Sequence, residues 1–171
     1  MKLGTSARQL SPDEQALVLR VFGPTLPPWR VIFIDDGLGL GDRPYTLDGP
    51  PGMYMIHIGP VAYPDCTSKA VWKGEQIDAT FIHEMTHVWQ YGKGYNVKLS
   101  SLWAQSFGEG YGYAPGQAWD DYNVEQQASI VETWYLGGMS TTADEFPYIA
   151  KVIRRGGLNK SSTLAQLRAM P

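Results

Sequence analysis

The chain has 171 residues, the usual size of one domain, and we expect a single domain that spans residues 1–171. Apolar residues make up 43% of the chain and charged residues 18%, a balance that excludes an intrinsically disordered protein. A formal net charge of −3 excludes nucleic acid as a partner, and no apolar run is long enough for a membrane span, so we expect no membrane partner either.

The first half of the chain is predicted to form one helix and two strands. A Ser-Pro-Asp-Glu capping sequence and the apolar positions after it predict a helix over 12–22. Runs of β-branched and aromatic residues predict strands over 30–34 and 53–58, which we expect to pair. Many Gly, Pro and Asp residues between them predict a loop over 35–52.

The second half of the chain is predicted to be mainly helical. A proline-containing loop leads to a helix over 75–91, closed by Gly92. Residues 106–117 alternate glycine with aromatic residues, which predicts an irregular strand or a loop that lines a cleft. The remaining predictions are a helix that runs through Trp134, with Asp120, Asp121 or Asn123 as its N-cap, and two short helices near 145–154 and 163–170.

The cysteine content and the first residues limit the cellular setting. Cys66 is the only cysteine, which excludes an internal disulfide and a thiolate zinc finger, and we expect its thiol to be buried and inert. Residues 1–6 lack the apolar segment of a signal peptide. We therefore expect a protein that is cytoplasmic in the producing cell, with secretion or injection into a target cell by a signal-independent route left open.

The segment His83-Glu84-Met85-Thr86-His87 carries the chemistry. Residues four apart share one face of a helix, so His83 and His87 can present two imidazoles to one divalent ion. Glu84 then stands beside the ion, where a general base must lie to take a proton from water. Two neutral imidazoles and one carboxylate suit a single catalytic zinc ion. The pattern predicts a zinc-dependent metallohydrolase that cleaves amide bonds.

A catalytic zinc needs a third protein ligand and one open position. Lys93 stands where an extended motif would place a third histidine, which excludes a ligand there. His57 lies in a predicted strand and is a weak candidate. The preferred third ligand is Glu125, near the start of a later predicted helix and close to small residues that allow helices to approach. Glu132 and Glu109 are the alternatives.

The stretch Phe81 to His87 resembles the active-site helix of thermolysin-like gluzincins, in which a downstream helix donates a glutamate. Together with Tyr122 to Ala128, the stretch His83 to Gln90 resembles a bacterial group of small metallopeptidase domains. Members of that group are fused to spike proteins of type VI and related contractile secretion systems, or are encoded beside them. The resemblance implies a zincin-like α+β fold. In that fold a small mostly antiparallel or mixed sheet packs on an active-site helix and a second ligand-bearing helix.

The resemblance also implies site roles: zinc on His83, His87 and Glu125, with Glu84 as base and proton shuttle. Thermolysin-like enzymes have Asn directly before the glutamate and Asp four residues after it, whereas Val124 and Ser129 stand here. The partners that orient the ligand histidines are therefore open, and the candidates are Asp78, Asp120, Asp121 and Glu132.

Peptidases of this type need a donor to the tetrahedral oxyanion besides zinc. Tyr113 is preferred because glycines surround it, and the alternatives are Tyr111, Tyr122 and His57. An edge strand near the active-site helix would bind the substrate backbone, a role that we predict for residues 53–58.

Three readings of the function remain open at this point. The first is a zinc metallopeptidase that acts on a protein or peptide substrate as a toxin delivered by a type VI system, with a spike protein and a cognate immunity protein as partners. The second is an amide hydrolase of bacterial cell-wall peptides. The third is a non-catalytic interaction module of a secretion spike. Glu84 argues against the third, because a structural metal site needs no base.

Overall fold

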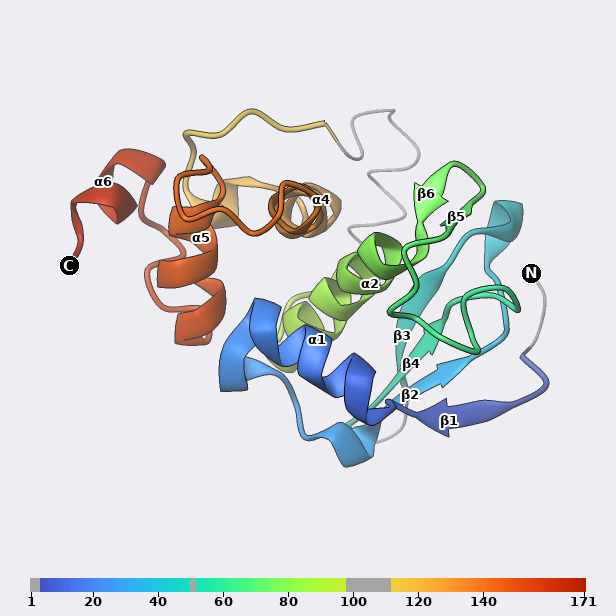
Figure 1. The fold of residues 1–171 in the computed structure, drawn as a ribbon. Coiled ribbons are helices and arrows are strands. Elements are labelled where there is room, and N and C mark those ends of the chain that lie inside the picture. The colour runs from blue at the N-terminus through green and yellow to red at the C-terminus, as the bar shows by residue number, and fades with distance from the viewer. Residues whose placement is uncertain (1–3, 50–51, 98–111) are drawn as a thin grey trace.

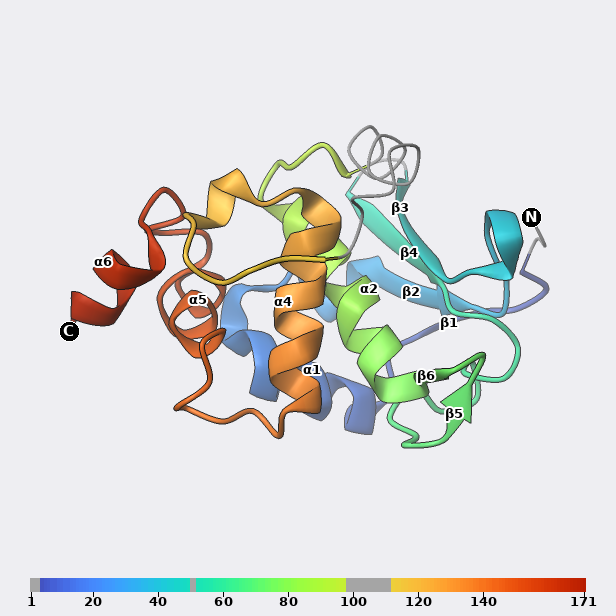
Figure 2. The same ribbon diagram turned by 90° about the horizontal axis from the view of Figure 1, so that it is seen from above.

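The helix α2 (Ile77–Gly92) lies between a small sheet and the helix α4 (Val124–Leu136) in the computed structural model (Figure 1, Figure 2). The structure describes residues 4–49, 52–97 and 112–171. None of the helices in this part of the chain combines the length and apolar character that a membrane span requires. The shorter C-terminal helices lie on the side of α4 away from the sheet (Figure 1). Helices with a small mixed sheet confirm the predicted α+β class.

The first helix, α1 (Pro12–Phe22), has the predicted bounds. Ser11 accepts a hydrogen bond from the backbone of Glu14, and the Glu14 side chain accepts one from the backbone of Ser11. Gly23, with φ of 62°, ends the helix in a conformation that favours glycine. Both ends of this helix were predictable because the signals that set them are local in the sequence.

The four-stranded sheet has the order β1-β2-β4-β3. Its strands β2 (Ile32–Asp35) and β4 (Met53–His57) pair in parallel; the sequence predicted that these two segments pair but not the direction. The flanking strands β1 (Ala7–Gln9) and β3 (Tyr45–Gly49) pair antiparallel to β2 and β4 respectively, so the sheet is mixed.

Three details of the sheet differ from prediction. The strand β3 forms inside the predicted loop 35–52, because pairing with β4 supplies backbone partners that the local sequence does not indicate. The three-residue strand β1 was not predicted. Residues Trp29–Val31 form a 3-10 turn closed by a bond from Val31 N to the carbonyl of Pro28, so β2 begins at Ile32 rather than at residue 30.

A hairpin of two very short strands, β5 (Val71–Trp72) and β6 (Glu75–Gln76), precedes α2. Its two turn residues, Lys73 and Gly74, have φ of 55° and 90°, as in a type I′ turn. Because Glu75–Gln76 belongs to β6, the helix α2 begins at Ile77 rather than at residue 75. Gly92 is its last residue and Lys93 its C-cap, so Gly92 is not the closing residue that we predicted.

The helix α2 is buried along almost its whole length, because the sheet and α4 cover opposite sides. In α4, Asn123 is the N-cap and forms a capping box with Gln126, and Gly137 is the C-cap. Residues 106–111 of the predicted irregular strand lie outside the described residues, and 112–117 are not in a strand. The remaining elements are α5 (Phe146–Lys151), α6 (Leu164–Ala169) and the 3-10 turns Gly23–Thr25, Leu40–Asp42, Trp119–Asp121 and Ile153–Arg155.

Candidate metal centre

Two histidines stand one turn apart on α2 and face α4. The ring centroids of His83 and His87 are 5.1 Å apart, with the rings edge to face. Their exposed fractions are only 9% and 5%, so both imidazoles are largely shielded from bulk water. A buried imidazole needs a polar partner at each ring nitrogen. The contacts of all four nitrogens therefore define the centre.

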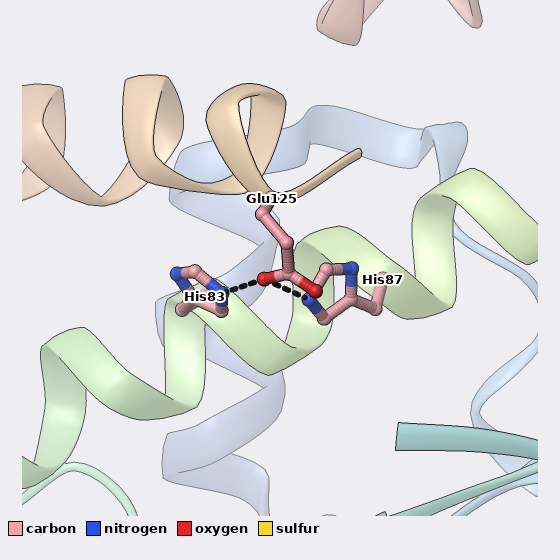
Figure 3. A group of neighbouring side chains, drawn as sticks. All are labelled: His83, His87 and Glu125. Atoms are coloured by element: carbon pink, nitrogen blue, oxygen red, sulfur yellow. Dashed lines mark hydrogen bonds and ion pairs between the residues drawn. The ribbon is translucent and has the colours of Figure 1, made fainter. Parts of the chain in front are cut away.

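Glu125, in the first turn of α4, points down between the two histidines (Figure 3). Its Oε2 lies 3.2 Å from His83 Nε2 and 3.4 Å from His87 Nε2. The three ligand atoms all lie within 4.8 Å of one another. Around a tetrahedral zinc with bonds of about 2.0–2.2 Å, neighbouring ligand atoms are about 3.3–3.6 Å apart. The three residues thus have the chemistry and spacing to hold one zinc ion.

Glu132 orients the first histidine. Its carboxylate lies 2.9 Å from His83 Nδ1, on the side of the ring away from Glu125. Glu132 stands two helical turns after Glu125, so both carboxylates lie on the same face of α4. With the proton of His83 held at Nδ1, the Nε2 lone pair is available to a metal. Of the candidates for this orienting role, Glu132 is the one that contacts His83, and it lies outside the group formed by His83, His87 and Glu125.

Two other candidates for that role have different partners. Asp78 is fully buried at the start of α2, where it accepts from Tyr135 and pairs with Lys69 at 2.5 Å. Asp120 accepts from Tyr95 at 3.0 Å, at the surface. These carboxylates fix elements of the fold and do not contact the ligand histidines.

Gln90 orients the second histidine, a role that the sequence analysis missed. Its Oε1 lies 2.8 Å from His87 Nδ1. Its Nε2 donates to the carbonyl of Val124 and to Gln127 Oε1, both at 2.9 Å. The double donation fixes which end of the amide faces His87, so Gln90 accepts the Nδ1 proton. Its position three residues after His87 on a helix was the available signal.

Glu84, the residue after His83 on α2, contacts the sheet. The hydroxyl of Thr46 donates to Glu84 Oε2 at 2.7 Å. Burial raises the pKa of Glu84, although the neighbouring histidines act in the opposite direction. A carboxylate with a raised pKa is a better proton acceptor than an exposed one.

His83 and Glu125 each stabilise the charged form of the other. Burial raises the pKa of Glu125, but hydrogen bonds from His83 and His87 outweigh this effect and hold the pKa well below its usual range. Burial lowers the pKa of His83, but contacts with Glu125 and Glu132 raise it well above its usual value. A divalent ion between His83 and Glu125 would take the place of the proton that they share.

A cleft of about 450 Å³ opens beside the centre. His83, Glu84 and Glu132 form its inner wall, so the general-base candidate faces a space that can hold a substrate. The outer wall comes from the segment before β3 and from the β5–β6 hairpin, and consists of Gly41, Asp42, Arg43, Pro44, Trp72, Lys73 and Glu75.

Comparisons with known proteins place this centre in a family. The solved structure of the effector domain of Pseudomonas aeruginosa VgrG2b matches with a TM-score of 0.54 and 30% identity, over 80% of this chain and 77% of that chain. The chain belongs to the family of the VgrG2b effector domain. The type VI secretion system spike protein VgrG2b of Pseudomonas aeruginosa is 34% identical over 140 residues, which are 77% of this chain but only 13% of the relative. No family model matches the chain.

In this member of the VgrG2b effector-domain family, the other predicted site residues that the structure describes lie away from the group of His83, His87 and Glu125. His57 Nδ1 pairs with Asp35 at 2.7 Å, and its ring stacks on Tyr45 with centroids 4.1 Å apart. These contacts give His57 a structural role across three strands, because Asp35, His57 and Tyr45 belong to β2, β4 and β3.

The preferred oxyanion donor also has another partner. The hydroxyl of Tyr113 donates to Glu145 at 2.9 Å, and its ring packs edge to face on Tyr122. Tyr122 itself donates to the carbonyl of Ala114 at 2.7 Å. The structure therefore does not bring Tyr113 or Tyr122 into the ligand group. Tyr111 and the alternative ligand Glu109 lie outside the described residues.

The predicted substrate strand is corrected. The sequence assigned this role to residues 53–58, but β4 is an inner strand with neighbours on both sides. The edge strand on the side of the centre is β3, which contributes Thr46. An inner strand has no free backbone groups for a peptide, whereas among the described residues β3 has a strand partner on one side only.

Proposed function

We propose that this member of the VgrG2b effector-domain family is a zinc-dependent peptidase with a zincin-like, gluzincin-type centre. We further propose that it acts as an effector delivered by a type VI secretion spike. One observation carries the enzymatic proposal. His83, His87 and Glu125 converge from two helices within 4.8 Å, with a buried carboxylate, Glu84, beside them at a cleft. The family supports the delivery proposal, since the VgrG2b relative is named as a type VI spike protein.

The chain's own residues hold the ion in one arrangement. His83 and His87 would bind through Nε2 because Glu132 and Gln90 occupy the Nδ1 atoms. Glu125 would supply the third bond and one negative charge. When bound, zinc supplies a Lewis acid that polarises the peptide carbonyl and makes water more acidic. Three protein ligands leave a coordination position open, as catalysis requires.

Glu84 moves the proton in the proposed reaction. Thr46 holds Glu84 Oε2, which leaves Oε1 to take a proton from the attacking water. The water oxygen forms a bond to the peptide carbonyl carbon, and the carbon–nitrogen bond breaks after Glu84 returns the proton to the amine. Burial raises the pKa of Glu84, which favours its role as acceptor and then donor of that proton.

The first test measures zinc content and proteolysis in the same preparations. Wild type should carry about one zinc per chain after dialysis and cleave a fluorogenic protein substrate. Glu84→Gln should keep its zinc and lose at least about a hundredfold in kcat. Glu125→Gln should lose both zinc and activity, whereas Glu145→Gln, a control outside the centre, should lose neither. A wild type that cannot be loaded with zinc, or a fully active Glu84→Gln variant, would overturn the proposal.

The same preparations address the cell-wall alternative. Purified crosslinked peptidoglycan, analysed for newly released peptides, is assayed beside the protein substrate. We expect cleavage of the protein substrate to dominate. Cleavage of the crosslinked wall peptides alone would keep the metal centre and change the substrate class.

A further inference from the structure

We propose that the cleft beside the metal centre selects substrates with an aspartate or glutamate side chain near the cleaved bond, and that Arg43 and Lys73 bind this carboxylate. The inference rests on the proposed peptidase function and deepens it by naming the substrate class. Both cations line the same cleft as His83 and Glu84, so a ligand in this cleft can contact the cations and the general-base candidate together.

Arg43 and Lys73 both have N–H groups available to donate hydrogen bonds to a ligand. Among the residues that the structure describes, the guanidinium of Arg43 has no ion pair or hydrogen bond, and the side chain is exposed. Lys73 Nζ donates to a backbone carbonyl, that of Asp42, at 2.5 Å and lies 5.0 Å from the centroid of the Trp72 ring. Neither contact neutralises the ammonium. A carboxylate ligand could therefore accept hydrogen bonds from both residues.

Four carboxylates line the cleft, those of Asp42, Glu75, Glu84 and Glu132. Three of them already accept hydrogen bonds from the protein: Glu132 from His83, Glu84 from Thr46 and Glu75 from Thr80. These hydrogen bonds hold Glu132 and Glu84 at the centre and Glu75 at the start of α2. Arg43 and Lys73, the cations of the outer wall, share that wall with Asp42 and Glu75.

The outer wall holds Lys73 in a defined place. Lys73 and Asp42 both have positive φ, 55° and 56°, which non-glycine residues seldom adopt. The Lys73 ammonium donates a hydrogen bond to the backbone carbonyl of Asp42. Trp72, beside Lys73, packs so tightly on Gly59 that an added Cβ there would lie 2.5 Å from the indole ring. The hairpin is thereby anchored to the loop after β4.

The test profiles cleavage of a synthetic mixture of random decapeptides by zinc-loaded protein, with products identified by mass spectrometry. Wild type should cleave peptides with Asp or Glu at one position near the cleaved bond about tenfold more often than peptides with Ala there. Arg43→Glu and Lys73→Glu should each abolish this preference, and the double variant should favour Lys or Arg at that position. The control Arg155→Glu, with the same charge change at an exposed residue outside the cleft, should keep the wild-type profile.

The outcomes separate the inference from the function beneath it. Cleavage without an acidic preference, or a preference that survives in the double variant, overturns the inference and leaves the peptidase intact. No cleavage of any peptide by zinc-loaded wild type overturns the proposed function, and the inference with it.

Discussion

The hydroxyl of Thr46 lies 2.7 Å from Glu84 Oε2 and 3.2 Å from the backbone carbonyl oxygen of Glu84. Thr46 is on the edge strand β3, and Glu84 is on α2. This contact is the link between the sheet and the general-base candidate. The sheet therefore fixes Glu84, while α4 supplies Glu125, so the two halves of the proposed chemistry are held from opposite sides of α2.

Replacing Thr46 by valine should weaken catalysis without removing the ion. Valine keeps the shape of threonine but cannot donate to Glu84, and a lost hydrogen bond to a charged group costs about 1.5–3 kcal/mol. We expect kcat to fall about ten- to a hundredfold, with unchanged zinc content by elemental analysis. Thr46→Ser, which keeps the hydroxyl, is the matched control. Equal kcat for the valine and serine variants would show that the contact does not orient the base.

Glu132 should control zinc affinity rather than the number of ligands. Glu132→Ala removes the acceptor of the His83 Nδ1 proton, which lies 2.9 Å away. Loss of such a partner weakens metal binding about 10–100-fold, measurable by competition with a chromophoric chelator. Glu132→Gln retains a carbonyl acceptor and should recover part of the loss. An unchanged zinc affinity in Glu132→Ala would contradict this assignment.

Gln90 should contribute to stability even without metal. Gln90→Leu removes one acceptor from His87 and two donations, to Val124 and Gln127, in a fully buried place. Each polar group left unsatisfied costs about 1–3 kcal/mol. We expect a lower free energy of unfolding in urea for the zinc-free variant than for zinc-free wild type. Gln126→Leu, at a half-buried position of α4, should cost less. Equal losses would mean that the buried amide has no special role.

The sequence predicted what depends on local spacing and missed what depends on distant contacts. Helical periodicity alone predicts that His83 and His87 share one face of α2. The capping sequence of α1 predicts the bounds of that helix. By contrast, β3 is a strand because β4 lies beside it, and the short hairpin carries no long apolar pattern. The choice of Glu132 among four carboxylates required the packing of α4 on α2. Side-chain partners across elements follow from the fold and not from the local sequence.

Glu14 should make the protein acid-sensitive. It is 1% exposed and accepts hydrogen bonds from Arg8 and from the backbones of Ser11 and Cys66. Burial raises the pKa of Glu14, but these contacts outweigh burial and lower it from 4.5 to about 2. Since the folded state has the lower pKa, the stabilisation is complete above pH 4.5 and is lost as the pH falls toward 2.

The measurement for Glu14 is the free energy of unfolding of wild type and Glu14→Gln between pH 7 and pH 2. Wild type should be more stable than the variant at pH 7 by about 1–3 kcal/mol, and the difference should shrink as the pH falls below 4.5. Asp13→Asn, an exposed neighbour on the same helix, should show no comparable convergence with wild type. A difference that is independent of pH would refute the linkage.

The size of the loss in kcat on replacing Tyr113 should show whether this residue is structural or donates to the oxyanion. Its hydroxyl donates to Glu145 at 2.9 Å, so Tyr113→Phe should lower the free energy of unfolding by about 1 kcal/mol. The kcat should stay within about twofold of wild type, whereas loss of an oxyanion donor costs about a hundred- to a thousandfold. Glu145→Gln should reduce stability similarly, and the double variant should lose less than the sum if the two groups act as a pair. A hundredfold loss of kcat with intact folding and zinc content would return Tyr113 to the reaction, as the sequence first suggested.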